Sequence, residues 1–135
     1  MAKYLLDTNI CIYFLRGNDQ IAVKINEIGV ENCYISEMTI AELLYGVEYS
    51  SQNKEANYRL VKNFIKDAQV MAVSNAIPVY AKEKALLRKT GALIDDMDIF
   101  IGATAIVNSM ILVTDNEKHL KRLSNIHIEN WILQR

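Results

Sequence analysis

Acidic side chains occur at four points of this 135-residue chain where a short apolar run gives way to a predicted helix. The four points are Asp7, Glu42, Asp98 and the pair Asp115-Asn116. If the apolar runs are parallel strands, their carboxyl ends form one edge of a sheet, and ligands bind at that edge in α/β proteins. Acids that are far apart in the sequence would then meet in space.

Carboxylates gathered in this way need a cation or raised pKa values, since two of them about 4 Å apart repel by about 4 kcal/mol at an effective dielectric of about 20. Mg²⁺ and Mn²⁺ prefer oxygen ligands and are held by one or two carboxylates, waters and substrate phosphate. Such an ion polarises a phosphoryl oxygen and activates water, and a further carboxylate orients or deprotonates that water. The pattern predicts a divalent-metal site for phosphodiester hydrolysis.

Each acid also has a purely structural explanation. Asp7 and Asp98 stand where Asp is a favoured N-cap residue. Glu42 follows Thr39 by three positions, the spacing of a capping box. Taken together, the repeated placement of acids at strand-to-helix junctions favours the metal site, and a helix N-terminus stabilises a carboxylate in either role.

Hydrophobic periodicity predicts an alternation of strands and helices. The strands are expected at residues 3–6, 33–36, 70–73, 111–114 and 126–128. The helices are expected at residues 10–15, 21–28, 39–47, 60–68, 76–90, 98–107 and 117–123. This alternation predicts an α/β fold, a three-layer α/β/α sandwich with a central, mostly parallel sheet of about five strands. Residues 1–135 are expected to form a single domain.

Two of the predicted helices carry unusual faces. Glu42 shares one face with Tyr45, Gly46 and Tyr49, and the two tyrosines are interpreted either as surface residues or as the lining of a groove for RNA or a partner protein. The helix that Asp98 opens has a face of small residues, which should let its backbone approach a neighbour closely and bring Asp98 to the edge of the sheet. Asp95 and Asp96 are interpreted as helix-start residues.

The net charge of −1 weakens the interpretation of a protein that holds nucleic acid through a basic surface alone. This charge is compatible with a nuclease, because a metal can supply positive charge at the phosphate that is cleaved. Cys11 and Cys33 are expected to be reduced core residues. Because no signal peptide precedes Asp7 and no apolar stretch is long enough to span a bilayer, we expect a soluble, cytoplasmic protein.

Four motifs, taken in order, resemble the PIN domain family and, more narrowly, the VapC-type toxins of bacterial toxin–antitoxin pairs. They are Asp7-Thr8-Asn9, Ser36-x-x-Thr39-x-x-Glu42-Leu43-x-x-Gly46, Gly91-x-x-Ile94-x-x-x-Asp98-x-x-Ile101-Gly102-Ala103, and Leu112-Val113-Thr114-Asp115-Asn116. No single motif is specific, but four in this order over nearly the whole chain are. The resemblance implies a Mg²⁺-dependent endoribonuclease, with Mn²⁺ as the alternative ion. It also implies a homodimer, neutralised by a cognate VapB-like antitoxin that places a basic side chain in the acidic pocket.

The resemblance also implies roles for individual residues. Asp7 and Asp98 would be the principal metal ligands, Glu42 would bind metal or position water, and Thr8 and Thr114 would give hydroxyl support.

The fourth acidic position of many relatives aligns with Asn116, one residue beyond Asp115. Either Asp115 turns inward to compensate, or Asn116 occupies the fourth position of the site.

Other functions fit less well. Metal-free acid–base cleavage of RNA would need a paired proton donor and acceptor, and the spacing of His119 and His127 in the sequence does not pair them. An aspartyl-phosphate hydrolase would have a second Asp where Asn9 stands, and a dinucleotide-binding domain would have a Gly-rich turn after the first strand. The main alternative is a PIN-like scaffold that binds RNA or protein without cutting. Trp131 is interpreted as an anchor for the last segment.

Overall fold

The computed structural model describes residues 2–132, in which five strands form one sheet in the order β3-β2-β1-β4-β5. The strands are β1 (Tyr4–Leu6), β2 (Cys33–Ser36), β3 (Val70–Met71), β4 (Ile111–Val113) and β5 (His127–Glu129). All four neighbouring pairs are parallel. The predicted five-stranded sheet is therefore confirmed, and β2 has the predicted bounds.

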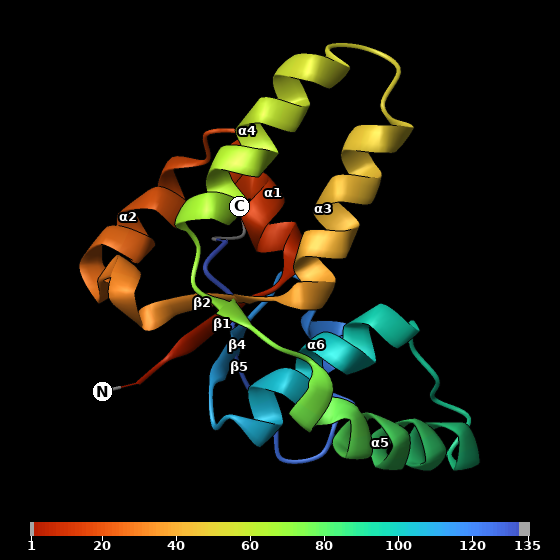
Figure 1. The fold of residues 1–135 in the computed structure, drawn as a ribbon. Helices are drawn as coiled ribbons and strands as arrows, with labels where there is room; N and C mark the ends of the chain where they lie inside the picture. The colour runs from red at the N-terminus through yellow and green to blue at the C-terminus, as the bar shows by residue number, and fades with distance from the viewer. Residues whose placement is uncertain (1, 133–135) are drawn as a thin grey trace.

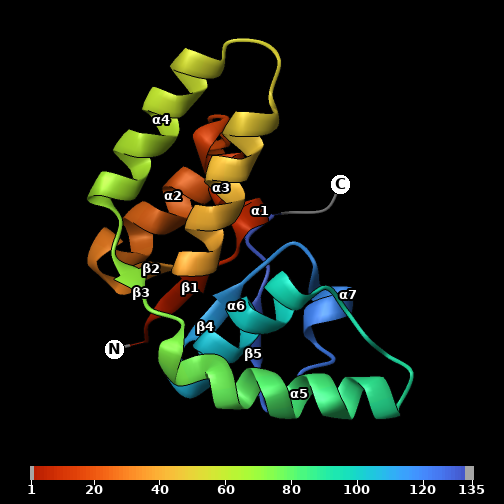
Figure 2. The same ribbon diagram turned by 45° about the vertical axis from the view of Figure 1, so that its right-hand side comes forward.

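Helices cover both faces of the sheet (Figures 1 and 2). They are α1 (Thr8–Leu15), α2 (Asp19–Ile28), α3 (Glu37–Tyr49), α4 (Lys54–Asp67), α5 (Ile77–Lys89), α6 (Asp96–Val107) and α7 (Glu117–Leu120), with short 3-10 turns η1 (Val30–Asn32) and η2 (Ser74–Ala76). Helices α1 to α4 lie on one side of the sheet, and α5 and α6 lie on the other (Figure 2). No helix within residues 2–132 is long and apolar enough to cross a membrane.

Two adjacent residues of β1 show how the layers are held together. Side chains alternate between the faces of a strand, so Leu5 and Leu6 enter different cores. Leu5 packs in the cluster that contains Leu87 of α5 and Ile99 of α6. Leu6 packs with residues of α1 to α4, such as Ile10. The α/β/α sandwich follows from this two-sided burial of a central strand.

Strand order reverses at β1, which has β2 on one flank and β4 on the other. In doubly wound sheets such a switch point leaves a crevice beyond the carboxyl ends of the two strands, and ligands bind there. Asp7 follows β1 and Thr114 follows β4. The topology thus brings residues from both ends of the chain to one crevice.

The predicted capping box at Thr39 and Glu42 is wrong. Helix α3 begins at Glu37, and its N-cap residue is Ser36, whose side chain accepts a hydrogen bond from the Met38 amide at 3.0 Å. Ser36 is the last residue of β2 and has an extended backbone, so it reaches the first free amides before Thr39 can. Glu42 is consequently a mid-helix residue, and its carboxylate is available for contacts with other elements.

Helix α6 also begins earlier than predicted. Asp95 occupies the N-cap position without a side-chain capping bond, and Asp98 lies in the first turn. Asp96, expected to start the helix, is in its first turn, and its carboxylate contacts α5, where it bonds Lys84 Nζ and the Tyr80 hydroxyl, each at 2.9 Å. Three acids close together in the sequence therefore have three different environments.

The small-residue face of α6 makes the close approach that the sequence predicts. A Cβ atom at Gly102 would overlap Cδ1 of Leu123, which is buried in the segment after α7. Helix α6 is thereby held against this segment, which connects α7 to β5.

Trp131 is buried and its ring packs against Tyr4 of β1, with ring centroids 5.7 Å apart. This contact confirms that Trp131 anchors the end of the chain. Cys11 and Cys33 are buried free thiols, also as expected.

Candidate active site

Asp7 lies at the end of β1 and is the N-cap residue of α1, with only 3% of its surface exposed. Its Oδ1 accepts a hydrogen bond from the Thr8 amide at 2.8 Å, and its Oδ2 accepts one from the Thr114 hydroxyl at 2.8 Å. Its own amide donates to the carbonyl of Val113. The capping role predicted for Asp7 is real, and it holds the carboxylate at the crevice between β1 and β4.

Thr114 connects three segments around this carboxylate. Its hydroxyl oxygen, besides donating to Asp7, accepts from the Asn116 amide at 2.9 Å and from the Asn9 side chain at 3.4 Å. Both the residue and its partner Asp7 are buried. The geometry therefore supports the hydroxyl-support position that the sequence predicts for Thr114.

Glu42 reaches the same region from α3. The Thr8 hydroxyl donates to Glu42 Oε1 at 2.6 Å. The same Thr8 oxygen lies 3.0 Å from the hydroxyl oxygen of Thr39. Thr8 therefore contacts Glu42 through its side chain and Asp7 through its backbone. This arrangement orients the half-buried Glu42 carboxylate toward the start of α1.

Asp98 brings a third carboxylate from α6. Its pKa rises to about 6, mainly because of burial and then because of the charges of Asp7, Asp95 and Glu42. Within residues 2–132 its carboxylate accepts no hydrogen bond that would offset this effect.

Burial also raises the pKa of Asp7, against the hydrogen bonds from Thr114 and Thr8, and the Glu42 charge adds to the rise. The charges of Asp7 and Glu42 raise the pKa of Asp98, and the charge of Glu42 raises that of Asp7. The three carboxylates therefore lie within electrostatic range of one another, as the sequence predicts.

No cation neutralises these carboxylates within the part of the chain that the structure describes. The salt bridges found there join Lys54 to Glu48 and Lys84 to Asp96, and neither involves Asp7, Glu42 or Asp98.

The described residues also contain no ready-made cluster of three His, Cys, Asp or Glu ligands. Mg²⁺ does not need one, because it keeps several waters and takes only one or two carboxylates. The oxygen donors and their uncompensated charge fit a hard divalent cation.

Asp115 is held by two side chains that the sequence analysis did not single out. Its Oδ2 accepts from the Tyr13 hydroxyl at 2.8 Å, and its Oδ1 accepts from the Asn130 amide at 3.0 Å. The hydrogen bond to Asp115 raises the pKa of Tyr13. Tyr13 lies in an apolar run that resembles core, and Asn130 follows the last strand without any motif, so nothing local marked either residue.

Asn116, the other candidate for the fourth position, occupies the N-cap position of α7 without a side-chain capping bond. Its backbone amide bonds Thr114, but its side-chain amide has no hydrogen-bond partner among residues 2–132. The restrained carboxylate of Asp115 and this free amide of Asn116 therefore differ clearly in environment.

His119 and His127 lie on α7 and β5, and both side chains are exposed. No hydrogen bond or salt bridge within the described range joins either one to Asp7, Glu42 or Asp98. The structure gives no geometric support to a metal-free histidine mechanism.

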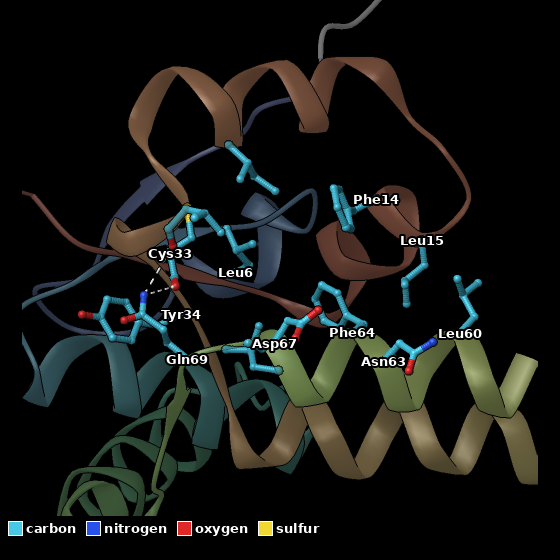
Figure 3. A pocket seen from close by; sticks show the side chains of 14 residues that line it. Leu6, Phe14, Leu15, Cys33, Tyr34, Leu60, Asn63, Phe64, Asp67 and Gln69 are labelled. Carbon is cyan, nitrogen blue, oxygen red and sulfur yellow. Dashed lines mark hydrogen bonds between the residues drawn. The ribbon is translucent and has the colours of Figure 1, made fainter.

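An apolar pocket of about 330 Å³, whose lining residues are drawn in Figure 3, includes none of Asp7, Glu42 and Asp98 in its walls. Its walls come from α1, the η1–β2 segment and α4, and they include Phe14, Tyr34 and Phe64. At its edge the Gln69 side chain donates to the Cys33 carbonyl at 2.9 Å (Figure 3). None of the predicted site residues lines this pocket.

A smaller recess of about 230 Å³ lies between α1, α3 and α4 and is bordered by Glu42. Through Glu42 it adjoins the acidic site, and its lining also includes Arg16, Gly46 and Asn57.

A parallel α/β sandwich that gathers uncompensated carboxylates at its switch point has the arrangement of a metal-dependent nuclease. The model of the PIN domain matches residues 4–126. "Ribonuclease VapC2" of Haemophilus influenzae is 34% identical over 137 residues, covering 98% of this chain and all of that protein. The chain belongs to the PIN-domain family, within its VapC group of ribonucleases.

Further relatives and solved structures are similar to the chain over nearly its whole length. The "tRNA(fMet)-specific endonuclease VapC" of Shigella flexneri is 28% identical over 132 residues, covering 97% of this chain and 99% of that protein. The crystal structure of DNA-bound VapBC from Salmonella typhimurium matches with a TM-score of 0.90 and 30% identity, covering 98% of this chain and 100% of the other. The structure of VapBC2 from Rickettsia felis, bound to a promoter DNA fragment, matches with a TM-score of 0.87 and 32% identity, covering 96% and 98%.

Proposed function

We propose that this protein is a divalent-metal-dependent endoribonuclease that acts as the toxin of a toxin–antitoxin pair. The observation that carries the proposal is the meeting of Asp7, Glu42 and Asp98 at one crevice without a neutralising cation. The names of the related ribonucleases support the same activity. We propose further that residues 1–135 act as one domain.

Asp7 and Asp98 are the proposed ligands of Mg²⁺, with Mn²⁺ as the alternative ion, and Glu42 stands beside them. The bound ion would supply Lewis-acid polarisation of a phosphoryl oxygen. The raised pKa of Asp98, at about 6, still leaves its carboxylate mostly ionised at neutral pH and able to bind a cation. Thr114 holds Asp7 in place and favours its charged form.

Glu42 is the proposed base. Its Oε1 is fixed by Thr8, which leaves the other carboxylate oxygen to orient a water molecule and accept its proton. The water oxygen forms a bond to phosphorus as the bond from phosphorus to the leaving ribose oxygen breaks, and the leaving oxygen takes a proton from solvent. Thr8 is therefore a positioning residue, and Asp115 and Asn116 complete the polar rim of the site.

The partners proposed are an RNA substrate, a cognate VapB-like antitoxin and a second copy of this chain in a homodimer. Structures titled as VapBC complexes support an antitoxin partner. Uncompensated carboxylates attract a basic side chain, so we propose that the antitoxin inhibits by placing one beside Asp7 and Asp98. The proposed place of action is the cytoplasm, where RNA and antitoxin meet.

A non-cleaving scaffold is the second candidate, and the residue that favours it is Asn116, a neutral side chain where the family resemblance implies an acid. The test is cleavage of purified RNA with and without Mg²⁺ by the purified chain. We expect Asp7→Asn and Asp98→Asn to abolish cleavage and Asp19→Asn, an exposed change in the first turn of α2, to leave it unchanged. RNA that stays intact over a range of Mg²⁺ and Mn²⁺ concentrations but is still bound would support the scaffold.

A second test uses living cells. Expression of the chain alone should arrest bacterial growth, and co-expression of a small protein from the neighbouring gene should relieve the arrest. Normal growth on strong induction of folded protein would contradict the toxin assignment. A complex with that protein in which the acidic crevice stays open would contradict the proposed mode of inhibition.

A further inference from the structure

The recess between α1, α3 and α4 adjoins the proposed active site because Glu42 lines both. Helices α3 and α4 lie side by side along it, with α1 behind them (Figure 1). Its polar groups include the guanidinium of Arg16 and the amide of Asn57. A ligand that reaches the carboxylates from this side must pass over the recess.

Gly46 lies in the recess wall, in the interior of α3, where glycine is less favourable than alanine. Its backbone is not in the left-handed region, and a Cβ atom there would meet no atom within 4 Å. Gly102 of α6 is different, because a Cβ there would overlap Leu123. Neither conformation nor internal packing requires a glycine at position 46, so the space is left open for a molecule outside the chain.

Arg16 provides an unpaired cation at this opening. Its side chain is exposed and forms no hydrogen bond or salt bridge with any residue in the range 2–132. A guanidinium binds phosphate through two parallel hydrogen bonds. The crevice of uncompensated carboxylates repels a polyanion, and Arg16 is a cation that lines the same recess as Glu42.

Tyr45 and Tyr49 extend the same face of α3 beyond Glu42 and Gly46. Their side chains are 66% and 79% exposed, and their rings stack with centroids 5.9 Å apart and planes inclined by 23°. Unpaired bases of single-stranded RNA stack on such exposed aromatic rings.

We propose that Arg16, Gly46, Tyr45 and Tyr49 form a binding strip for single-stranded RNA on one side of the scissile phosphate. Arg16 contacts a backbone phosphate, a nucleotide lies against the bare helix at Gly46, and the tyrosine pair stacks on bases further along. The strip rests on the proposed function, because Glu42 links it to the site of cleavage. It gives that function specific contacts for the RNA strand on one side of the cleaved bond.

The test measures affinity in the Asp98→Asn background, which separates RNA binding from cutting. A labelled single-stranded RNA of about 12 nucleotides is titrated with protein and followed by fluorescence anisotropy. We expect Gly46→Leu, which fills the recess, to weaken binding about tenfold, as the loss of one good contact does. Ala85→Leu puts the same side chain on an exposed position of α5, on the other side of the sheet (Figure 2), and should bind normally.

Arg16 and the tyrosines give independent readouts. Arg16→Ala should reduce the slope of log Kd against log salt by about 0.7, the contribution of one phosphate contact on a single strand, and Arg16→Lys should restore it. Changing Tyr45 and Tyr49 together to Ala should weaken binding at least about fivefold. A duplex of the same sequence should bind more weakly and be insensitive to the tyrosine change.

The outcomes separate this strip from the nuclease activity. Unchanged RNA affinity in both Gly46→Leu and Arg16→Ala overturns the strip, even if the wild-type chain cuts RNA. The losses described above support it, even if the wild-type chain cuts nothing. If Gly46→Leu binds RNA like Ala85→Leu but is no longer neutralised by the neighbouring gene's product, the recess is a protein contact and the strip is wrong.

Discussion

Thr114 and Asp7 are 107 positions apart in the chain, yet the hydroxyl of one donates a 2.8 Å hydrogen bond to the buried carboxylate of the other. The bond joins the carboxyl ends of β4 and β1, the two strands at which the strand order reverses. It favours the ionised form of Asp7 against the effect of burial. Through this pair the sheet topology controls the charge of a proposed metal ligand.

Replacing Thr114 with Val removes that hydrogen bond and preserves the shape of the side chain. The pKa of Asp7 should rise further, so the acid limb of the cleavage–pH profile should move up by about one pH unit or more, the value of a hydrogen bond to a charged group. Thr104→Val is the matched control, since among the described residues the Thr104 hydroxyl bonds only the Phe100 carbonyl, within α6. A profile that does not move would show that Thr114 does not tune Asp7.

Metal uptake should release protons at mildly acidic pH. The pKa of Asp98 is about 6, so close to half of its carboxyl groups carry a proton at that pH, and a bound cation requires the ionised form. Calorimetric titration with Mn²⁺ at pH 6, in two buffers of different ionisation enthalpy, should give about half a proton or more released per ion. At pH 8 the release should be close to zero. Equal proton release at both pH values would argue against Asp98 as a ligand.

Asp98→Asn should stabilise the metal-free protein at neutral pH. The pKa of Asp98 rises from its ordinary value of 3.8 to about 6 on folding, so the folded state binds the proton more tightly and this residue's contribution to stability falls as pH rises from about 4 to about 6. Asp98 is only partly buried and solvent screens its charge, so we expect a gain in the free energy of unfolding of about 1 kcal/mol at pH 7.

Urea unfolding at pH 7 and near pH 4 checks this difference, which should vanish at the lower pH. Adding Mg²⁺ should raise the unfolding free energy of the wild type but not of Asp98→Asn, because only the wild type binds the ion tightly. A variant less stable than wild type at pH 7 would contradict the electrostatic argument.

Asp115 should act through its contacts with Tyr13 and Asn130 and not as a metal ligand, because both of its carboxylate oxygens already accept hydrogen bonds. Asp115→Asn should lower the unfolding free energy by about 1–2 kcal/mol and change the Mn²⁺ dissociation constant less than about threefold. Asn116→Ala serves as the comparison at the neighbouring position. A loss of Mn²⁺ affinity of about tenfold or more in Asp115→Asn would place Asp115 in the metal site.

Gly46→Ala should raise the free energy of unfolding by about 0.5–1 kcal/mol, because alanine is the better helix former and its methyl group enters open space. Thermal or urea unfolding measures the gain. Gly102→Ala is the contrasting variant and should show no such gain, since its methyl group would collide with the buried Leu123. A destabilised Gly46→Ala would mean that the chain itself requires this glycine.

The order of strands and helices follows from local sequence. Runs such as Cys33–Ser36 are apolar enough to be buried on both faces of a sheet, and the predicted strand has the observed bounds. Turn residues mark the ends of helices, as Gly29 does with its positive φ of 97° after α2. These features depend on residues close together in the chain, so the fold class and the placement of acids at strand-to-helix junctions could be predicted without tertiary information.

The partners of individual side chains were decided only by packing between distant elements. Asp96 and Asp98 are two residues apart, but Asp96 pairs with Lys84 of α5 while Asp98 is held near Asp7. The Thr39–Glu42 spacing suggested a local cap, and the fold instead gives Glu42 to Thr8 of another helix. A sequence records which groups can ionise or donate, but the energy of each group depends on its neighbours and burial, and these exist only after the sheet has brought α1, α3 and α6 to one crevice.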